Sequence, residues 1–183
     1  SPTFRTALSG WITRLNFALL PPQCQVSGLD GLRGHDICQA CAASLPWNLG
    51  ACVGCGVPLP AEEGRRCGQC MRLQRPWEYV HASFLYDAPV AGLLRRFKFH
   101  EDLAAGRLLS ALMLHSLADV PCPQALLAVP LHRARLCQRG YNQARELARP
   151  LARQLQLPLL DGLRRERGTA RQSELDAEAR ARN

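Results

Sequence analysis

"CVGCGVPLPAEEGRRCGQC", residues 52–70, decides how the first part of this chain folds. Its four cysteines form two Cys-x2-Cys pairs, Cys52 with Cys55 and Cys67 with Cys70, and eleven residues separate the pairs. Each pair is typical of a knuckle, a tight turn whose backbone amides point at the sulfurs. Two knuckles supply four thiolates in a tetrahedron, the donor set of a structural Zn²⁺ site. We therefore predict a closed zinc site with no open position for catalysis.

An incomplete copy of this pattern precedes it, in "CQVSGLDGLRGHDICQAC", residues 24–41. Its second Cys-x2-Cys pair is intact, but Cys24 is followed three residues later by Ser27, where a thiol would complete the knuckle. Serine is a poor zinc ligand because its hydroxyl stays protonated, whereas His35 could supply an imidazole nitrogen. Three alternatives stay open: zinc held by Cys24, Cys38, Cys41 and His35; a weak or absent metal site; and a shell completed by Ser27 or water.

The nine cysteines favour metal binding over disulfides. Seven lie between residues 24 and 70, and Cys122 and Cys137 are scattered. An odd count with clustered pairs, and a start without the features of a signal peptide, indicate a reducing compartment such as the cytoplasm. No run of 18 or more apolar residues occurs, so the sequence predicts no transmembrane segment.

Three regions follow from the pattern of residues. Residues 1–22 place apolar side chains on one helical face, which predicts an amphipathic helix that docks on its own protein or, less simply, on a membrane surface. Residues 23–75 are rich in Cys and Gly and form the double zinc ribbon. In residues 76–183, expected strands alternate with expected helices, which is typical of an α/β unit with a parallel sheet.

The elements expected in the α/β region are short. We predict strands at 81–86, 125–131 and 157–160, and helices at 89–99, 103–118, 142–157 and from 174 onward. Pro150 is expected to kink or break the third of these helices.

Positive charge gathers in the last part of the chain. The formal net charge is +8, and residues 131–183 alone contain twelve Arg against six Asp and Glu. Such a balance favours an anionic partner, either a phosphorylated small molecule or nucleic acid, although a solvated basic surface would look the same. Lys98 is the one lysine beside 22 arginines.

The stretch "AVPLHRARLCQRGYNQARELA", residues 128–148, carries the most specific pattern. A buried strand ends at Pro130, a basic loop with Arg133, Arg135 and Arg139 follows, and Asn142 is placed to cap the next helix. A helix N-terminus beside arginine side chains suits an anion. The alternative is an ordinary loop with surface arginines.

At these residues the sequence resembles the ComF family of phosphoribosyltransferase-like proteins, which includes competence proteins and the GntX type. The double ribbon at 24–70, "YDAPVAGLLRRFKF" at 86–99 and "RERGTARQSELDAEARARN" at 165–183 agree with the family's layout. The resemblance covers essentially the whole chain. It implies a zinc-ribbon module followed by a type I phosphoribosyltransferase-like, Rossmann-like domain.

The resemblance also implies roles for individual residues. Lys98 would lie near a phosphate site, and Arg139, Asn142 and Gln143 beside the active-site cleft. Arg167, Thr169 and Gln172 would belong to a loop that closes over phosphoribosyl pyrophosphate with its Mg²⁺. Transfer in such enzymes needs cations at the leaving pyrophosphate and a loop that excludes water.

Two features depart from the family pattern. Ser27 stands where a cysteine is usual, and no strand ending in two Asp with a Thr-Thr-Gly-type loop occurs before Asn183. The phosphoribosyltransferase-like domain is therefore expected to lack its C-terminal part, and this fragment is expected to be inactive as a transferase.

The resemblance supports three functions. The first is a role in DNA uptake, with single-stranded DNA and a helicase-type protein as partners, in the cytoplasm at the inner face of the membrane. The low aromatic content of 6% would make backbone contacts dominate over base stacking. The second is a phosphoribosyltransferase, in the full-length form, with an unknown acceptor. The third is a non-catalytic scaffold stabilised by zinc.

Overall fold

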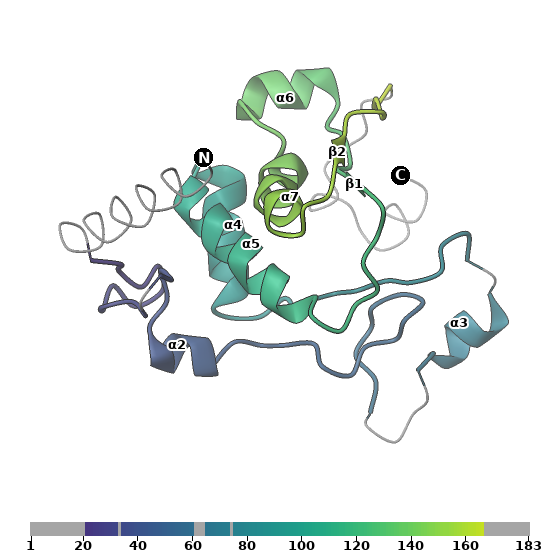
Figure 1. Cartoon of the computed structure of the whole chain (residues 1–183), viewed down its shortest axis with the longest axis horizontal. Coiled ribbons are helices and arrows are strands. Elements are labelled where there is room, and N and C mark those ends of the chain that lie inside the picture. Colours follow the sequence, from purple (N-terminus) through teal and green to yellow (C-terminus); the bar gives the residue numbers. More distant parts are fainter. Residues whose placement is uncertain (1–20, 33, 61–64, 74, 167–183) are drawn as a thin grey trace, which may run out of the picture. The chain divides into compact units, whose positions relative to one another are not determined.

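The computed structural model describes residues 21–32, 34–60, 65–73 and 75–166 (Figure 1). The chain divides into two compact units, residues 1–121 (unit 1) and 122–183 (unit 2), and each is considered by itself. Within the described ranges, no helix is both long and apolar enough to cross a membrane. Residues 1–20 of the helix expected at 1–22, and the whole of the helix expected from 174 onward, lie outside the described residues.

Two small ribbons begin unit 1, and their backbones follow the same path. The first ribbon is residues 21–45 and the second is residues 50–73. Each starts with a turn closed by an antiparallel bridge, between Gln23 and Asp30 in the first and between Ala51 and Pro58 in the second. A short helix ends each, α2 (Gln39–Ala43) and α3 (Gly68–Arg72), directly after a cysteine at the N-cap position. The double ribbon expected from the cysteine spacing is thus present.

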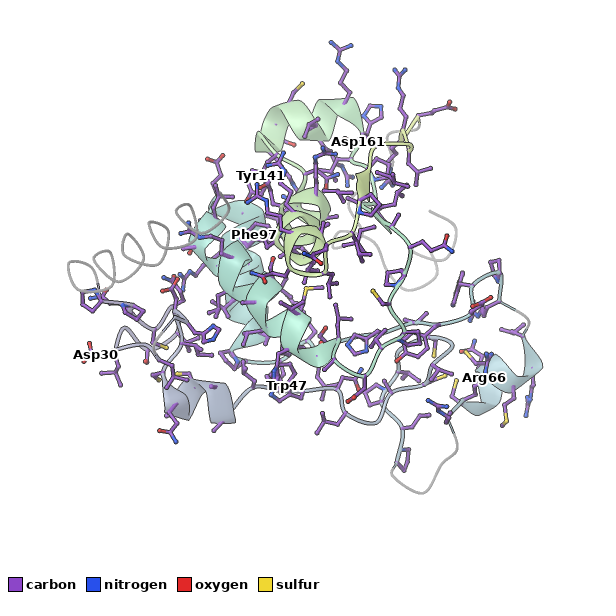
Figure 2. The ribbon with its side chains drawn as sticks, viewed as in Figure 1. Asp30, Trp47, Arg66, Phe97, Tyr141 and Asp161 are labelled. Carbon is purple, nitrogen blue, oxygen red and sulfur yellow. The ribbon has the colours of Figure 1, made fainter. Side chains whose placement is uncertain are left out.

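Two helices, α4 (Val90–Phe99) and α5 (Leu103–Ser116), pack side by side in unit 1 (Figure 1). Apolar side chains at helical spacing face the partner helix and are buried: Val90, Leu93 and Phe97 on α4, and Ala105, Leu108 and Leu109 on α5. Phe97, labelled in Figure 2, is 1% exposed and lies over Gly106, where a Cβ atom would stand 2.5 Å from its ring. This glycine therefore sets how closely the two helices approach.

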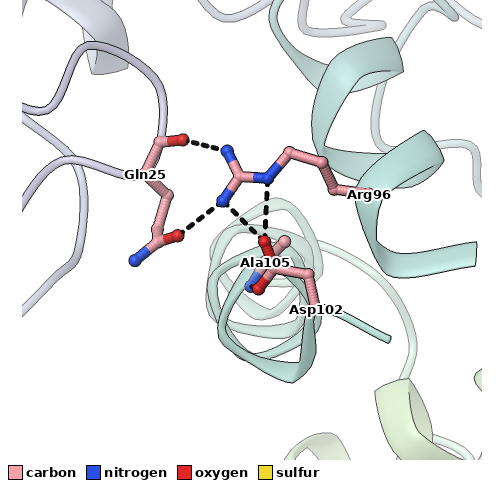
Figure 3. Close-up of polar contacts among 4 residues, drawn as sticks. All are labelled: Gln25, Arg96, Asp102 and Ala105. Carbon is pink, nitrogen blue, oxygen red and sulfur yellow. Dashed lines mark hydrogen bonds and ion pairs between the residues drawn. The ribbon is translucent and has the colours of Figure 1, made fainter. Parts of the chain in front are cut away.

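Arg96 of α4 joins this helix pair to the first ribbon (Figure 3). Its guanidinium donates to the backbone oxygen of Gln25 and, at 2.7 Å, to the Gln25 side-chain oxygen. It also donates at 2.8 Å to Asp102, which caps α5 by accepting from the Ala105 amide. This network joins the first ribbon to the helix pair within unit 1. The boundary expected near residue 75 stays a prediction.

Unit 2 contains a parallel pair of strands joined through two helices. The order is β1 (Leu126–Leu127), α6 (Arg133–Arg139), α7 (Gln143–Gln154) and β2 (Leu159–Leu160). Leu126 pairs with Leu159 and Leu127 with Leu160. α7 contacts both strands, and Leu151 and Ala152 are buried on it. This parallel unit has the α/β character expected from the sequence, on a small scale.

Several expected elements differ from the observed ones. Residues 81–86 form no strand, because only Phe84 pairs, through a single bridge to Trp47. The basic loop expected after Pro130 is instead helix α6. Pro150 is expected to kink or break its helix; the break is wrong, since α7 continues through Pro150 to Gln154, and the kink stays a prediction. A proline costs an interior helix roughly 3 kcal/mol, and the burial of the next two residues offsets this cost.

Candidate functional site: two thiol clusters and a basic cavity

The second ribbon gathers the sulfurs of Cys52, Cys55, Cys67 and Cys70 within 4.8 Å of one another. The Cys55 and Cys67 sulfurs are 3.8 Å apart. A tetrahedron with Zn–S bonds of about 2.3 Å has S–S edges of about 3.8 Å, so this spacing fits zinc. The Cys67 amide donates to the Cys52 sulfur at 3.2 Å, as expected of a knuckle that holds thiolates.

The protonation of these thiols also fits a cation. The hydrogen bond from the Cys67 amide lowers the pKa of the Cys52 thiol to about 6, against the effect of burial. Burial, together with the neighbouring thiols, raises the pKa of Cys70 to about 12. Four thiols this close do not all ionise unless a cation joins them, and Zn²⁺ supplies that charge. The donor set leaves no open position, so the metal suited to this cluster is structural.

The first ribbon gathers three sulfurs, those of Cys24, Cys38 and Cys41, within the same 4.8 Å. Burial would raise the pKa of the Cys24 thiol, but hydrogen bonds from the Ser27 hydroxyl and from backbone amides outweigh it and lower the pKa to about 6. The arrangement therefore favours a thiolate at Cys24, which is the form that binds a metal.

Ser27, and not His35, lies against these three sulfurs. Its amide lies 3.5 Å from the Cys24 sulfur and its hydroxyl oxygen 3.6 Å from the Cys38 sulfur. His35 is exposed and is not a member of the thiol group, and its amide donates to the Leu32 carbonyl. All nine cysteines are free thiols, as the expectation of metal binding rather than disulfides requires.

Unit 2 contains a basic cavity of about 410 Å³. It is bounded by the chain that leaves β1, the end of α6, the start of α7 and the chain that follows β2. Ligands of parallel α/β units bind at this edge of the sheet, beyond the carboxyl ends of the strands. Six charged side chains line it, namely Arg145, Arg149, Arg164, Arg165, Glu146 and Asp161, and their sum is positive. Tyr141 and Asp161, both in the lining, are labelled in Figure 2.

Asn142 fixes the geometry of this cavity from two sides. Its side-chain oxygen accepts from the Ala144 amide at 3.0 Å and caps α7, as the sequence predicts. Its side-chain nitrogen donates at 3.0 Å to the Val129 carbonyl, in the chain that leaves β1. One amide group thus holds the α7 N-terminus beside the carboxyl end of β1, where an anion would meet the helix dipole.

The structure brings together some of the residues that the resemblance singled out. Asn142 lines the cavity, and beside it Arg139 donates to the Gln143 side-chain oxygen at 3.2 Å. The Gln143 side-chain nitrogen is buried without a hydrogen-bond partner among the described residues. Lys98 lies exposed on α4, in unit 1. Arg167, Thr169 and Gln172 lie outside the described residues.

Sequence reasoning missed the other charged residues of the cavity. Arg145 and Arg149 follow Asn142 by three and seven residues, so all three share one face of α7, and helical spacing alone could have indicated this. Arg145 pairs with Asp161 and Arg149 with Glu146. The Asp161 contact depends on the pairing of β1 with β2, which no short motif encodes.

Comparison with known proteins identifies the ribbons and gives the chain relatives. Residues 15–71 match the family model of the double zinc ribbon domain. The DNA utilization protein YhgH of Salmonella typhi is 32% identical in an alignment of 154 positions that covers 80% of this chain and 67% of that protein. Competence protein F of Haemophilus influenzae is 31% identical over 80% of this chain and 65% of its own length.

A longer alignment is found with the DNA utilization protein YhgH of Escherichia coli K12. It is 30% identical over 172 residues, 90% of this chain and 75% of that protein. The alignments thus span about two thirds to three quarters of the length of these relatives. No solved structure matches the chain.

Proposed function

The chain belongs to the ComF family, and from that premise we propose that it serves the uptake and use of external DNA, with unit 2 contacting single-stranded DNA. The relatives are named for competence and for DNA utilization, which supports the first part. The second part rests on the charge of unit 2. In this proposal the protein acts in the cytoplasm, at the inner face of the membrane and beside a helicase-type partner.

The observation that carries the proposal is how the arginines of unit 2 are presented. Residues 122–183 contain twelve Arg against six acidic residues, whereas residues 1–121 contain eleven basic against nine acidic residues. Arg133 on α6, Arg149 on α7 and Arg164 after β2 are all exposed, and the last two line the basic cavity. Exposed guanidinium groups on three neighbouring segments suit the repeated phosphates of a strand.

This surface favours backbone contacts over base reading. Residues 122–183 contain one tyrosine, Tyr141, and neither tryptophan nor phenylalanine. Stacking on aromatic rings therefore contributes little, and affinity should come from phosphate neutralisation with the release of counterions. Binding of this kind depends weakly on base sequence and steeply on salt.

The test compares two triple variants that remove the same charge. In unit 2 the variant is Arg133→Ala, Arg149→Ala and Arg164→Ala, and in unit 1 the control is Arg72→Ala, Arg95→Ala and Arg107→Ala, all at exposed positions. Affinity for a fluorescent oligo-dT is measured by anisotropy over a range of salt. The plot of log K against log salt should become less steep by about 2 in the unit 2 variant, and by much less in the control.

Two outcomes contradict the proposal. If the unaltered chain does not bind oligo-dT even at low salt, unit 2 is no single-stranded DNA surface. If both triple variants lose the same affinity, the attraction comes from net charge alone and not from the arginines of unit 2.

A second candidate function, transfer of a phosphoribosyl group, is favoured by the position of the basic cavity. It lies beyond the carboxyl ends of parallel strands and beside a capped helix N-terminus, which is where phosphates bind in α/β domains. In this candidate, phosphoribosyl pyrophosphate with Mg²⁺ occupies the cavity, and the acceptor is unknown.

Thermal unfolding separates the two candidates. Phosphoribosyl pyrophosphate with Mg²⁺ should raise the melting temperature of the full-length form if it binds there, and Asn142→Ala should reduce the shift because it removes the cap and the tie to Val129. No shift at millimolar ligand contradicts the transferase. The third alternative, a zinc-stabilised scaffold, predicts neither this shift nor salt-dependent binding of DNA.

A further inference from the structure

We propose that Ser27 occupies the fourth position of the first ribbon's metal site, and that this position is open to a thiolate ligand from outside the chain. The proposal concerns the three-thiol cluster alone and does not depend on the function of unit 2. It departs from the second ribbon, where four cysteines fill every position.

The backbone places Ser27 where the second ribbon has Cys55. In both turns the backbone amide of the first cysteine donates to a backbone carbonyl five residues later. Cys24 donates to Leu29 at 2.7 Å, and Cys52 donates to Val57 at 2.8 Å. In both, the glycine after the fourth position has φ +74° and donates to the first cysteine carbonyl. Ser27 precedes Gly28 just as Cys55 precedes Gly56. The side chains of Ser27 and Cys55 therefore start from the same position in two turns of the same conformation.

The distances agree with a ligand position. A tetrahedral zinc with Zn–S of about 2.3 Å and Zn–O of about 2.0 Å has an S–O edge of about 3.5 Å. The Ser27 hydroxyl oxygen is 3.6 Å from the Cys38 sulfur, close to that edge. In the second ribbon, the Cys55 sulfur is 3.8 Å from the Cys67 sulfur, which matches the S–S edge of a zinc tetrahedron. Ser27 thus stands at the fourth vertex.

Exposure of the cluster is one-sided. Cys24 and Cys38 are 2% and 8% exposed, while Ser27, Val26 and Gly28 are all exposed. The side of the cluster at Ser27 therefore faces solvent, whereas Cys24 and Cys38 face the protein and Cys41 is half-buried. A ligand from solution reaches the metal position by displacing one hydroxyl, without opening the ribbon.

The chemistry of the hydroxyl makes that displacement favourable. A neutral serine oxygen is a far weaker ligand for Zn²⁺ than a thiolate, and three protein ligands with one exchangeable position are the pattern of open zinc sites. With a metal held by Cys24, Cys38 and Cys41, an external thiol would lose its proton to solvent, its sulfur would take the fourth position, and the Ser27 hydroxyl would leave unchanged. Charge and atoms balance, and no oxidant is needed. The ligand class is a low-molecular-weight thiol.

The test loads the full chain with Co²⁺, whose sulfur-to-cobalt charge-transfer absorption grows with the number of bound thiolates. The probe is 2-mercaptoethanol. The unaltered chain should bind two Co²⁺ and gain absorption that saturates at one thiol per chain. Ser27→Cys should start at the higher absorption and gain none. Ser27→Ala should still respond, because it leaves three thiolates and an open position.

A second measurement uses zinc itself. Release of Zn²⁺ to a chromogenic chelator should show one fast and one slow phase, and Ser27→Cys should slow the fast phase by at least about tenfold. His35→Ala should change neither readout. The proposal is overturned if only one metal binds per chain, if 2-mercaptoethanol leaves the spectrum unchanged, or if His35→Ala abolishes the fast-exchanging metal.

Discussion

The two ribbons of unit 1 share their backbone and differ in their donors. Both have a bridged turn, a left-handed glycine and a short helix whose N-cap is a cysteine. The second gathers four sulfurs, whereas the first gathers three beside the Ser27 hydroxyl. The first ribbon lacks the fourth thiol but keeps a backbone amide that points at a sulfur, since the Ser27 amide lies 3.5 Å from the Cys24 sulfur.

This difference separates the fold of a ribbon from the strength of its metal site. Turn hydrogen bonds and the glycine conformation set the path of the backbone, so one lost thiol leaves that path intact. The first ribbon also has support that comes from outside it, in the Arg96 network with Gln25 and Asp102. A ribbon with a weaker metal site can persist when the rest of its unit holds it.

The largest effect is expected from removing one thiol of each ribbon in turn. Cys70→Ala leaves the second ribbon three thiolates and a buried gap, so that ribbon should hold its metal less firmly and lose part of the stabilisation that zinc supplies, which is about 10–16 kcal/mol in zinc-finger peptides. Cys41→Ala should cost the first ribbon less, since that site starts with three thiolates. Metal content by mass spectrometry and limited proteolysis measure both. Equal losses in the two variants would contradict the comparison.

A smaller effect is expected at Arg96, which ties the first ribbon to α4 and α5. Arg96→Ala should lower the free energy of unfolding by about 1–2 kcal/mol, because it removes charge-assisted hydrogen bonds from a half-exposed group. It should also speed metal release from the first ribbon alone. Arg95→Ala, an exposed neighbour with the same charge, is the control for urea unfolding and metal release. Faster release from the second ribbon would show that the tie is not specific.

The smallest effect concerns the pH dependence of the same network. Burial raises the pKa of the Asp102 carboxyl, but the Ala105 amide and the Arg96 guanidinium outweigh it and hold that pKa below its usual range. The stabilisation is therefore complete above the unfolded pKa of about 3.9 and is lost as pH falls through the folded pKa.

Asp102→Asn isolates this contribution because asparagine keeps the cap of α5 and removes the charge. The unaltered chain should be more stable than the variant by under about 1 kcal/mol at pH 6, and the difference should shrink as the pH falls below the unfolded pKa of about 3.9. Release of metal in acid affects both proteins and cancels in the difference. A difference that grows as the pH falls contradicts the assignment.

Sequence reasoning reached the local features of this molecule. Cysteine spacing predicted the four-sulfur cluster, and the position of Asn142 before an amphipathic stretch predicted its cap. Both depend on residues a few positions apart, where turn and helix geometry leave little choice. The family resemblance is confirmed by relatives of about 30% identity over most of the chain.

Features that depend on distant residues were less accessible. The arginines after Pro130 formed helix α6 rather than a loop, and nothing in its burial explains this. Pro150 did not end α7, because packing of that helix on the strands outweighs local preference. The meeting of Arg96 with Gln25 joins residues 71 positions apart, and no local signal predicts it. The phosphoribosyltransferase-like domain expected from the resemblance is represented among the described residues by one small parallel unit, and the complete fold remains a prediction.

The reciprocal exchange of the two unlike donors tests the account most directly. Cys55→Ser gives the second ribbon the donors of the first, and Ser27→Cys gives the first ribbon the donors of the second. Zinc release to a chromogenic chelator is followed in each variant and in the double variant. If the donors decide, Cys55→Ser should make both phases fast, Ser27→Cys should make both slow, and the double variant should again show one of each. Two unchanged phases in Cys55→Ser would mean that the surrounding fold, and not the fourth ligand, sets how firmly each ribbon holds its metal.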